Sequence, residues 1–227
     1  MISFGLVTEG LTDQIVIEHI LAGYFNSPDL DIRQLQPERD KDNENKSTYG
    51  GWTLVINYCK SRDFQEALQF IDYIIIQIDT DVSELKNYNI PQQDENGEFT
   101  PQQLIEKVIE KFRAVIGDDF YSKYQQKIIF AISVHFIECW LLPLYYTEKK
   151  KKSKFKGCLR DLNLQLAKKH KFTIDANAKN PEYYRVISEP YRKHKTLMDC
   201  YQDNPSLKSF VVDIESKKIV IVLEDEW

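Results

Sequence analysis

Short, continuously apolar runs alternate along the chain with longer segments whose apolar residues recur every three or four positions. Three runs have the length and composition of buried strands: residues 2–8, 73–78 and 128–134. A weaker strand is predicted over 32–36, ahead of a polar loop. Helical spacing covers residues 11–25, 52–70 with a break at 61–63, and 102–116. This alternation predicts an α/β fold, with a mostly parallel sheet of about four strands and helices on both faces.

The C-terminal third of the chain has a weaker pattern. An aromatic-rich helix is predicted over 135–146, and the periodicity then fades from Lys149 onward. The remaining expected elements are a helix over 159–169 and a hairpin formed by 210–214 and 219–223. We therefore expect a main domain at residues 1–147 and a basic extension of helical and hairpin structure at 148–227.

Composition excludes several classes of protein. With 42% hydrophobic and 29% charged residues among 227, the chain has the make-up of a folded globular protein. Its formal net charge of −5 argues against coating nucleic acid by bulk electrostatics. No apolar run approaches the roughly 20 residues of a membrane helix, and the N-terminus lacks the features of a secretory signal. We therefore expect a cytoplasmic protein with no membrane partner.

Four cysteines are scattered through the chain without a CxxC pair: Cys59, Cys139, Cys158 and Cys200. This spacing indicates neither a zinc site nor a disulfide framework. We expect all four side chains to be reduced thiols.

Acidic side chains follow two of the predicted strands. Glu9 ends the first strand, and Asp79 and Asp81 end the strand at 73–78. Parallel sheets bind ligands beyond the carboxyl ends of their strands, and alternate residues of an extended tip project to the same side. Three carboxylates without an adjacent His or Cys favour Mg²⁺ or Mn²⁺ over zinc. An acid after a strand also serves as a helix cap or turn residue, but two such sites together favour a metal site.

Two short motifs carry a family resemblance: Glu9-Gly10-Leu11-Thr12-Asp13 and Ile78-Asp79-Thr80-Asp81. They resemble the Toprim domain, the catalytic module of topoisomerases, primases, small-RNA maturases and the OLD-type nucleases of phage defence. The resemblance covers about residues 1–146, and a free-standing nuclease is the closer comparison. It implies that 1–147 is a catalytic domain in which Glu9, Asp79 and Asp81 gather divalent metal for phosphodiester chemistry on DNA or RNA. Such a metal would polarise the phosphoryl group and activate a water, with Glu9 as an alternative acid or base.

A third stretch, residues 133–142, runs from the end of a strand to a Trp-Leu-Leu sequence. It is similar to the strand-to-helix segment of several Toprim-like proteins linked to bacterial defence. On the predicted helix, His135 and Glu138 are three residues apart and share a face near the strand ends. Glu138 is a candidate metal ligand or water-orienting group, and His135 is a candidate phosphate contact or proton shuttle. A histidine that starts a helix and a buried, hydrogen-bonded glutamate are the structural alternatives.

Positive charge is concentrated in a basic block at 149–156, which also contains an aromatic residue. Lysines mixed with aromatic rings are typical of single-strand nucleic-acid sites, where bases stack on the rings and amines follow the phosphates. A solvated linker is the alternative interpretation. The candidate nucleic-acid contacts are Lys150, Lys152, Lys154 and Lys156, together with Arg39 in the loop after the second strand.

Other functions fit parts of the same pattern. A DxD motif after an apolar strand also marks nucleotide-sugar glycosyltransferases, in which Glu9 would have no assigned role. Phosphatases of the haloacid dehalogenase type carry Thr or Val where this chain has Ser83. A non-catalytic or partner-activated Toprim-fold subunit is the remaining alternative; any ATPase would be a separate partner, because the chain has no phosphate-loop motif. A homo-oligomer is compatible with the chain, although no residue specifies one.

Overall fold

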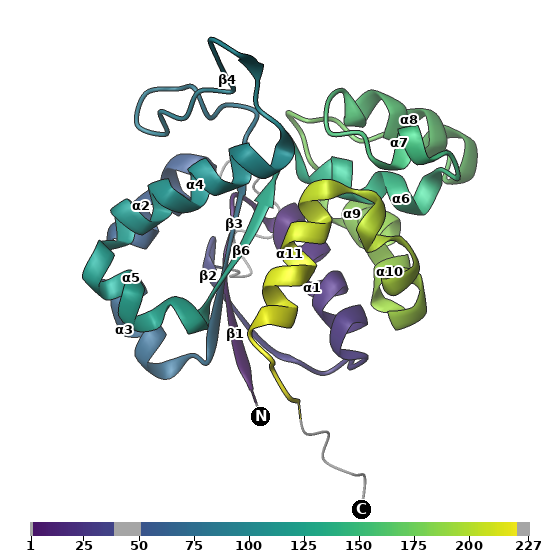
Figure 1. The fold of residues 1–227 in the computed structure, drawn as a ribbon. Helices are drawn as coiled ribbons and strands as arrows, with labels where there is room; N and C mark the ends of the chain where they lie inside the picture. Colours follow the sequence, from purple (N-terminus) through teal and green to yellow (C-terminus); the bar gives the residue numbers. More distant parts are fainter. Residues whose placement is uncertain (1, 39–50, 222–227) are drawn as a thin grey trace, which may run out of the picture.

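The computed structural model describes residues 2–38 and 51–221. A four-stranded sheet contains β1 (Ser3–Val7), β2 (Asp31–Gln36), β3 (Tyr73–Asp79) and β6 (Ile128–Ser133). The strand order is β2-β1-β3-β6, and every neighbouring pair is parallel (Figure 1). A separate short hairpin, β4 (Gln93–Asp94) and β5 (Gly97–Glu98), lies in the connection between β3 and the next helix. The predicted α/β class and its four-stranded parallel sheet are therefore confirmed.

One face of the sheet is covered by three helices: α2 (Trp52–Lys60), α3 (Arg62–Phe70) and α4 (Pro101–Ile116). Ile74, Ile76 and Ile78 of β3 enter the apolar core that these helices form. Because alternate strand residues face opposite sides, the three isoleucines make one apolar stripe along the strand. The connection from α4 into β6 contains α5 (Asp118–Tyr124) and the 3-10 turn η1 (Gln125–Lys127).

The opposite face is covered by α1 (Leu11–Phe25) and by helices from the C-terminal part, which share one core with Phe4, Leu6 and Ile75. In Figure 1, α1 in purple lies beside α9 and α10 in green and α11 in yellow. The C-terminal elements are η2 (Ile137–Leu141), α6 (Leu142–Tyr145), α7 (Lys149–Lys152), α8 (Cys158–Lys169), α9 (Pro181–Ser188), η3 (Glu189–Arg192), α10 (His194–Cys200), η4 (Tyr201–Asp203) and α11 (Pro205–Ser216).

The C-terminal part is built into the fold through two close contacts. At Gly23 of α1, a β-carbon would lie 1.9 Å from the main-chain oxygen of Tyr191, so no side chain fits there. The Gly23 carbonyl also accepts a hydrogen bond from His194 Nδ1 at 2.9 Å. On the outer edge of β6, Asp213 of α11 accepts the main-chain amide of Phe130 at 2.8 Å. The C-terminal helices therefore cover a face of the sheet and satisfy an amide on its edge.

Local signals set the helix boundaries that the sequence predicts. Ser61 accepts the Phe64 amide at 3.2 Å and starts α3 directly after α2, at the expected break. Thr100 and Gln103 form a capping box at the start of α4, with Pro101 in its first turn. None of the helices within residues 2–38 and 51–221 is both long and apolar enough to cross a membrane.

The predicted helix over 135–146 is wrong. His135 has a φ of 62°, which lies in the left-handed region and is incompatible with an α-helix. The chain then forms the 3-10 segment η2 and the single turn α6. Pro143 accounts for part of this break, because proline lacks an amide and its ring clashes with the preceding turn of a helix.

The predicted hairpin in the last 20 residues is also wrong. Residues 210–214 lie in α11, where the apolar side chains recur at helical spacing and enter the core. Asn204 caps this helix by accepting the amides of Ser206 and Leu207, and Pro205 occupies its first turn. Residues 219–221 follow α11 without regular structure, and 222–223 lie outside the described residues.

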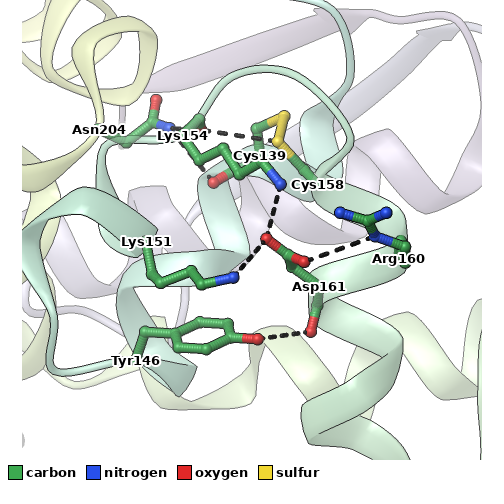
Figure 2. Close-up of polar contacts among 8 residues, drawn as sticks. All are labelled: Cys139, Tyr146, Lys151, Lys154, Cys158, Arg160, Asp161 and Asn204. Carbon is green, nitrogen blue, oxygen red and sulfur yellow. Dashed lines mark hydrogen bonds and ion pairs between the residues drawn. A yellow bond between two sulfur atoms is a disulfide. The ribbon is translucent and has the colours of Figure 1, made fainter.

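Cys139 and Cys158 form a disulfide that joins η2 to the first residue of α8 (Figure 2). The expectation of four reduced thiols is therefore wrong for this pair. The fold brings the two residues to a Cα distance of 5.1 Å across a sequence separation of 19, which spacing alone does not reveal. Cys59 and Cys200 are free, as expected, and both are buried.

Candidate functional site

Glu9 and Asp79 lie where the order of the strands reverses. The chain passes from β1 to β2 on one side of β1, while β3 pairs with the other side. Glu9 comes shortly after β1, and Asp79 is the last residue of β3. Open parallel sheets bind ligands in the crevice beyond such a switch point. The acids predicted from two separate strands therefore meet where this kind of fold places a site.

Glu9, Gln77 and Asp79 form a closed set of hydrogen bonds. The Asp79 amide donates to Glu9 Oε1 at 2.7 Å, and Gln77 Nε2 donates to Asp79 Oδ1 at 2.9 Å. The Glu9 amide donates in turn to Gln77 Oε1 at 3.1 Å. Gln77 is fully buried and faces the same side of β3 as Asp79, because one residue separates them. Sequence reasoning missed Gln77, which fixes the two acids relative to each other.

Asp13, in the first turn of α1, adds a further buried acid. The residue is 3% exposed, and its Oδ1 has no hydrogen-bond partner among the described residues. A buried polar oxygen without a partner costs free energy unless a donor or a cation meets it. Burial raises the pKa of Asp13 to about 6, with Lys179 opposing this shift and Glu138 adding to it. Asp13 belongs to the motif that resembles Toprim, but the sequence alone assigned it no role.

Burial and crowding raise the pKa values of the acids at the strand ends. The pKa of Glu9 rises to about 8, first through burial and then through repulsion from Asp13. Burial also raises the pKa of Asp79 well above its usual range, and Glu9 repels its charge. Asp81 is only half-buried, and burial is again the main cause that raises its pKa. Carboxylates gathered in this way attract a cation, because a positive charge relieves both their repulsion and their lost hydration.

The C-terminal part of the chain supplies a cation to these acids. Lys179, just ahead of α9, forms an ion pair with Glu138 at 3.0 Å, and Tyr184 of α9 donates a hydrogen bond to the same carboxylate. Burial would raise the pKa of Glu138, which is 2% exposed, but Lys179 and Tyr184 outweigh burial and lower it. Burial opposes the charge on Lys179, yet Glu138 and Asp13 hold the pKa of Lys179 well above its usual range. Lys179 and Tyr184 are further residues that sequence reasoning missed.

The turn that carries Asp81 is bound to the end of β6. The main-chain oxygen of His135 accepts the amides of Thr80 and Asp81, both at 3.2 Å. The His135 amide donates to Thr80 Oγ1 at 2.8 Å, and Thr80 is fully buried. Gln92 adds two hydrogen bonds from Nε2 to the carbonyls of Thr80 and Asp81, at 2.9 and 3.2 Å. The position of Asp81 is thus fixed from outside β3.

His135 and Glu138 do not share a helical face, contrary to the prediction, because no α-helix forms there. The ring of His135 stacks on Phe155, with 6.2 Å between the ring centroids, whereas Glu138 contacts Lys179. Burial lowers the pKa of His135, and the nearby Lys156 adds to this effect. The structure thus brings Glu138 to the acids at the strand ends and directs the His135 ring to the C-terminal part.

We call the charged residues gathered near the C-terminal ends of the strands the strand-end cluster: Glu9, Asp13, Asp79, Asp81, Glu138 and Lys179. In the part of the chain that the structure describes, no three His, Cys, Asp or Glu side chains already stand as a set that could hold a metal ion. The donor chemistry nevertheless fits a hard divalent cation, since it consists of carboxylate oxygens, one of them buried and unpaired. The Lys179 ammonium neutralises part of the negative charge of this cluster.

The basic block at 149–156 surrounds a buried carboxylate of the same chain. Asp161, in the first turn of α8, is 2% exposed. Its Oδ2 lies 2.7 Å from Lys154 Nζ and 3.1 Å from Lys151 Nζ (Figure 2). A buried carboxylate depends on such partners, so Lys154 has a structural role whatever else it contacts. Lys150 is exposed on α7.

Two other lysines of the block also form ion pairs within the chain. Lys152 lies 2.8 Å from Asp203, and Lys156 lies 2.6 Å from Glu98. The second pair links the β4–β5 hairpin to the C-terminal part across the edge of the sheet that carries the strand-end cluster. Arg39, the remaining nucleic-acid candidate, lies outside the described residues.

Comparisons with known proteins assign no role to these residues. A scan against protein-family models, a search of curated proteins and a search of solved structures each found no significant match. The function of the strand-end cluster therefore has to be argued from the residues of this chain.

Proposed function

We propose that the chain is a divalent-metal-dependent phosphodiesterase, a nuclease acting on DNA or RNA, in which Glu9, Asp79 and Asp81 hold Mg²⁺ or Mn²⁺. The observation that carries this proposal is the convergence of Glu9 and Asp79 at the switch point, where the Asp79 main-chain amide donates a hydrogen bond of 2.7 Å to the Glu9 carboxylate. Buried Asp13, with its unpaired oxygen, adds to the negative charge there. Mg²⁺ prefers such oxygen donors and commonly takes further ligands from a phosphate.

The residues of the cluster would divide the work in this reaction. A bound metal would supply Lewis acidity and lower the pKa of an attacking water. Lys179 stays protonated near neutral pH, because its pKa lies above its usual range, so its ammonium can offset charge that develops on the phosphoryl oxygens. Glu138 and Tyr184 orient that ammonium through the ion pair and the hydrogen bond that they share.

Nucleic acid is the proposed substrate class because the basic block contacts the end of β6 through Phe155, whose ring stacks on His135. Lys150 is exposed and available to a phosphate. Lys156 and Glu98 form a pair in which both side chains are about half exposed, and such pairs are weak enough for a phosphate to replace. Contacts from Lys152, Lys154 and Arg39 remain predictions.

The cellular setting is a further part of the proposal. Defence against phage or another mobile element rests on the Toprim resemblance alone, as does a separate ATPase or other defence subunit as partner. We place the protein in the cytoplasm, where its substrate would lie. The disulfide between Cys139 and Cys158 argues against this location, since cytoplasmic thiols are kept reduced. Thiol labelling of the protein in acid-quenched cells would show which state is populated there.

The test of the proposed function is a cleavage assay with the purified full chain. Labelled single- and double-stranded DNA and RNA, including transfer RNA, would be incubated with Mg²⁺, Mn²⁺ or EDTA. The variant Asp79→Asn/Asp81→Asn removes two charges without changing side-chain volume, and Asp119→Asn removes one exposed charge on α5 as a matched control. We expect metal-dependent cutting that the double variant loses by at least about 100-fold and the control retains.

Other outcomes would point to the alternatives. A folded wild-type chain that binds Mn²⁺ but cuts nothing would favour a partner-activated or non-catalytic subunit. Hydrolysis of a nucleotide sugar in place of nucleic acid would favour the glycosyltransferase interpretation, which leaves the Glu9–Asp79 hydrogen bond without a role. Absence of both binding and cutting would leave Lys179 as the permanent counter-ion of a structural acid cluster.

A further inference from the structure

His135 has a backbone conformation that is uncommon outside glycine. Its φ of 62° lies in the left-handed region, which non-glycine residues seldom adopt, although asparagine, aspartate and histidine do so more often than the others. Asparagine and glycine tolerate this region, whereas β-branched residues do so least. A histidine held in this conformation needs compensation from its surroundings, and cases of this kind are concentrated at functional sites.

The compensation comes from the two main-chain groups of His135, its carbonyl and its amide, which both form hydrogen bonds with the turn that carries Asp81. The His135 carbonyl accepts both amides of the Thr80-Asp81 pair at 3.2 Å, and the His135 amide donates to Thr80 Oγ1 at 2.8 Å. These groups point back toward the end of β3 because the chain bends at His135 instead of continuing into a helix. An extended or right-handed backbone at this residue would turn its carbonyl away from the two amides.

We propose that His135 is a positioning residue whose main chain, held in the left-handed conformation, sets the position of the Asp81 carboxylate in the strand-end cluster. The functional part of this inference rests on the proposed nuclease activity, but the positional part does not. The imidazole serves a different purpose: it stacks on Phe155, which lies within the basic block. The residue therefore ties the turn of one metal-holding acid to the C-terminal part of the chain.

The inference predicts an unusual ranking of variants at one position. His135→Gly and His135→Asn keep access to the left-handed region, His135→Ala has reduced access, and His135→Val has the least. Thr80→Ser keeps the hydroxyl that accepts a hydrogen bond from the His135 amide. Thr80→Val removes this hydroxyl and nearly preserves the side-chain volume. Circular dichroism and thermal melts would first establish which variants fold; His135→Ala is retained in case His135→Val does not.

Amide hydrogen exchange at Thr80 and Asp81, measured on the metal-free protein, tests the positional part directly. We expect the Gly and Asn variants to protect both amides within about threefold of the wild type. The Ala and Val variants should exchange at least 10-fold faster at the Asp81 amide, while the Thr80 amide keeps its hydrogen bond of 3.1 Å to the Ser133 carbonyl and amides in α4 stay unchanged. Equal protection of the Asp81 amide in all four variants would overturn the inference, whether or not the protein cuts nucleic acid.

The cleavage assay tests the functional part. We expect the Val variant to lose at least 10-fold in kcat with little change in KM, and the Gly and Asn variants to recover most of that loss with an unchanged pH profile. If Gly and Asn lose activity as fully as Val, and the pH profile loses one limb, the imidazole acts chemically and the inference is overturned. If the wild type does not cut at all, the proposed function fails, and the exchange experiment alone decides the role of His135.

Discussion

The strand β3 presents very different side chains to the two faces of the sheet. Toward α2, α3 and α4, β3 presents Ile74, Ile76 and Ile78, all fully buried in one apolar core. Toward α1 and the C-terminal helices, it begins with Tyr73 and Ile75 but continues with Gln77 and ends with Asp79. The first face is apolar along its whole length, whereas the second becomes polar as it reaches the switch point.

This difference shows where buried polar groups lower the stability of the fold. Burial of carboxylates without full partners is unfavourable, and stability lost in this way is a common feature of functional sites. The C-terminal part that covers this second face also has specific links: the Cys139–Cys158 disulfide, the buried Asp161 with its two lysines, and the close contact at Gly23. We infer that the apolar face is maintained by packing and the polar face by packing together with specific links.

The largest expected effect is on the apolar face. Ile76→Ala removes a fully buried side chain and leaves a cavity, so we expect a loss of about 4 kcal/mol in the free energy of unfolding. Urea denaturation would measure it. Because this face has no part in the cluster, addition of Mn²⁺ should stabilise the variant and the wild type equally. A Mn²⁺ response that is lost in Ile76→Ala would contradict the separation of the two faces.

The next effect concerns the disulfide on the polar face. Cys139→Ser/Cys158→Ser opens a loop set by a sequence separation of 19, which corresponds to about 3 kcal/mol of stability. Thermal unfolding with and without dithiothreitol would test this. The wild type should lose stability on reduction and approach the double variant, which should not respond. Equal stability of the reduced and oxidised wild type would show that the link adds nothing to this face.

A smaller effect of opposite sign is expected at the strand-end cluster. Asp79→Asn removes a crowded buried charge, so the metal-free variant should be more stable than the wild type by about 1 kcal/mol. The same variant should lose the stabilisation that Mn²⁺ gives the wild type. Asp119→Asn, in an exposed position, is the control for both measurements. A destabilised metal-free Asp79→Asn would mean that the Gln77 hydrogen bond outweighs the repulsion.

The smallest effect is pH-dependent and lies between α1 and α9. His19 is buried, contacts Ser188 Oγ at 2.8 Å and has Glu189 at 3.6 Å. Burial lowers its pKa, Arg192 adds to this, and Glu189 and Glu18 oppose it. As the pH drops below about 6.5, His19 takes up a proton in the unfolded chain but stays neutral in the folded chain. The free energy of unfolding therefore falls as the pH drops below this value. His19→Gln should lose less stability than the wild type between pH 7.5 and 5.5 in urea titrations; an equal loss would contradict this.

The sequence predicted the sheet and two of its acids for a definite reason. Continuous apolar runs specify buried strands, and Glu9 and Asp79 directly follow such runs, so their meeting depends only on parallel order. Asp13 was visible in the same motif, four residues after Glu9, but its burial depends on the packing of α1. Lys179 left no signal, because it lies in an irregular segment between α8 and α9 and meets Glu138 only through tertiary packing.

The errors have equally specific causes. The apolar residues at 210–214 fit either a strand or a buried helix, and short runs of this kind do not distinguish the two. The helix expected over 135–146 ignored Pro143 and could not include the left-handed backbone of His135. The disulfide depends on the tertiary approach of η2 to the start of α8, which cysteine spacing does not encode.

The most direct test of the central claim is an anomalous difference map, measured at the manganese absorption edge, from crystals of the full chain grown with MnCl₂. We expect a peak within coordination distance of Glu9, Asp79 and Asp81, with Lys179 beside it. A map without a manganese peak at the strand ends, from crystals grown at saturating MnCl₂, would contradict the claim that this cluster is a metal site.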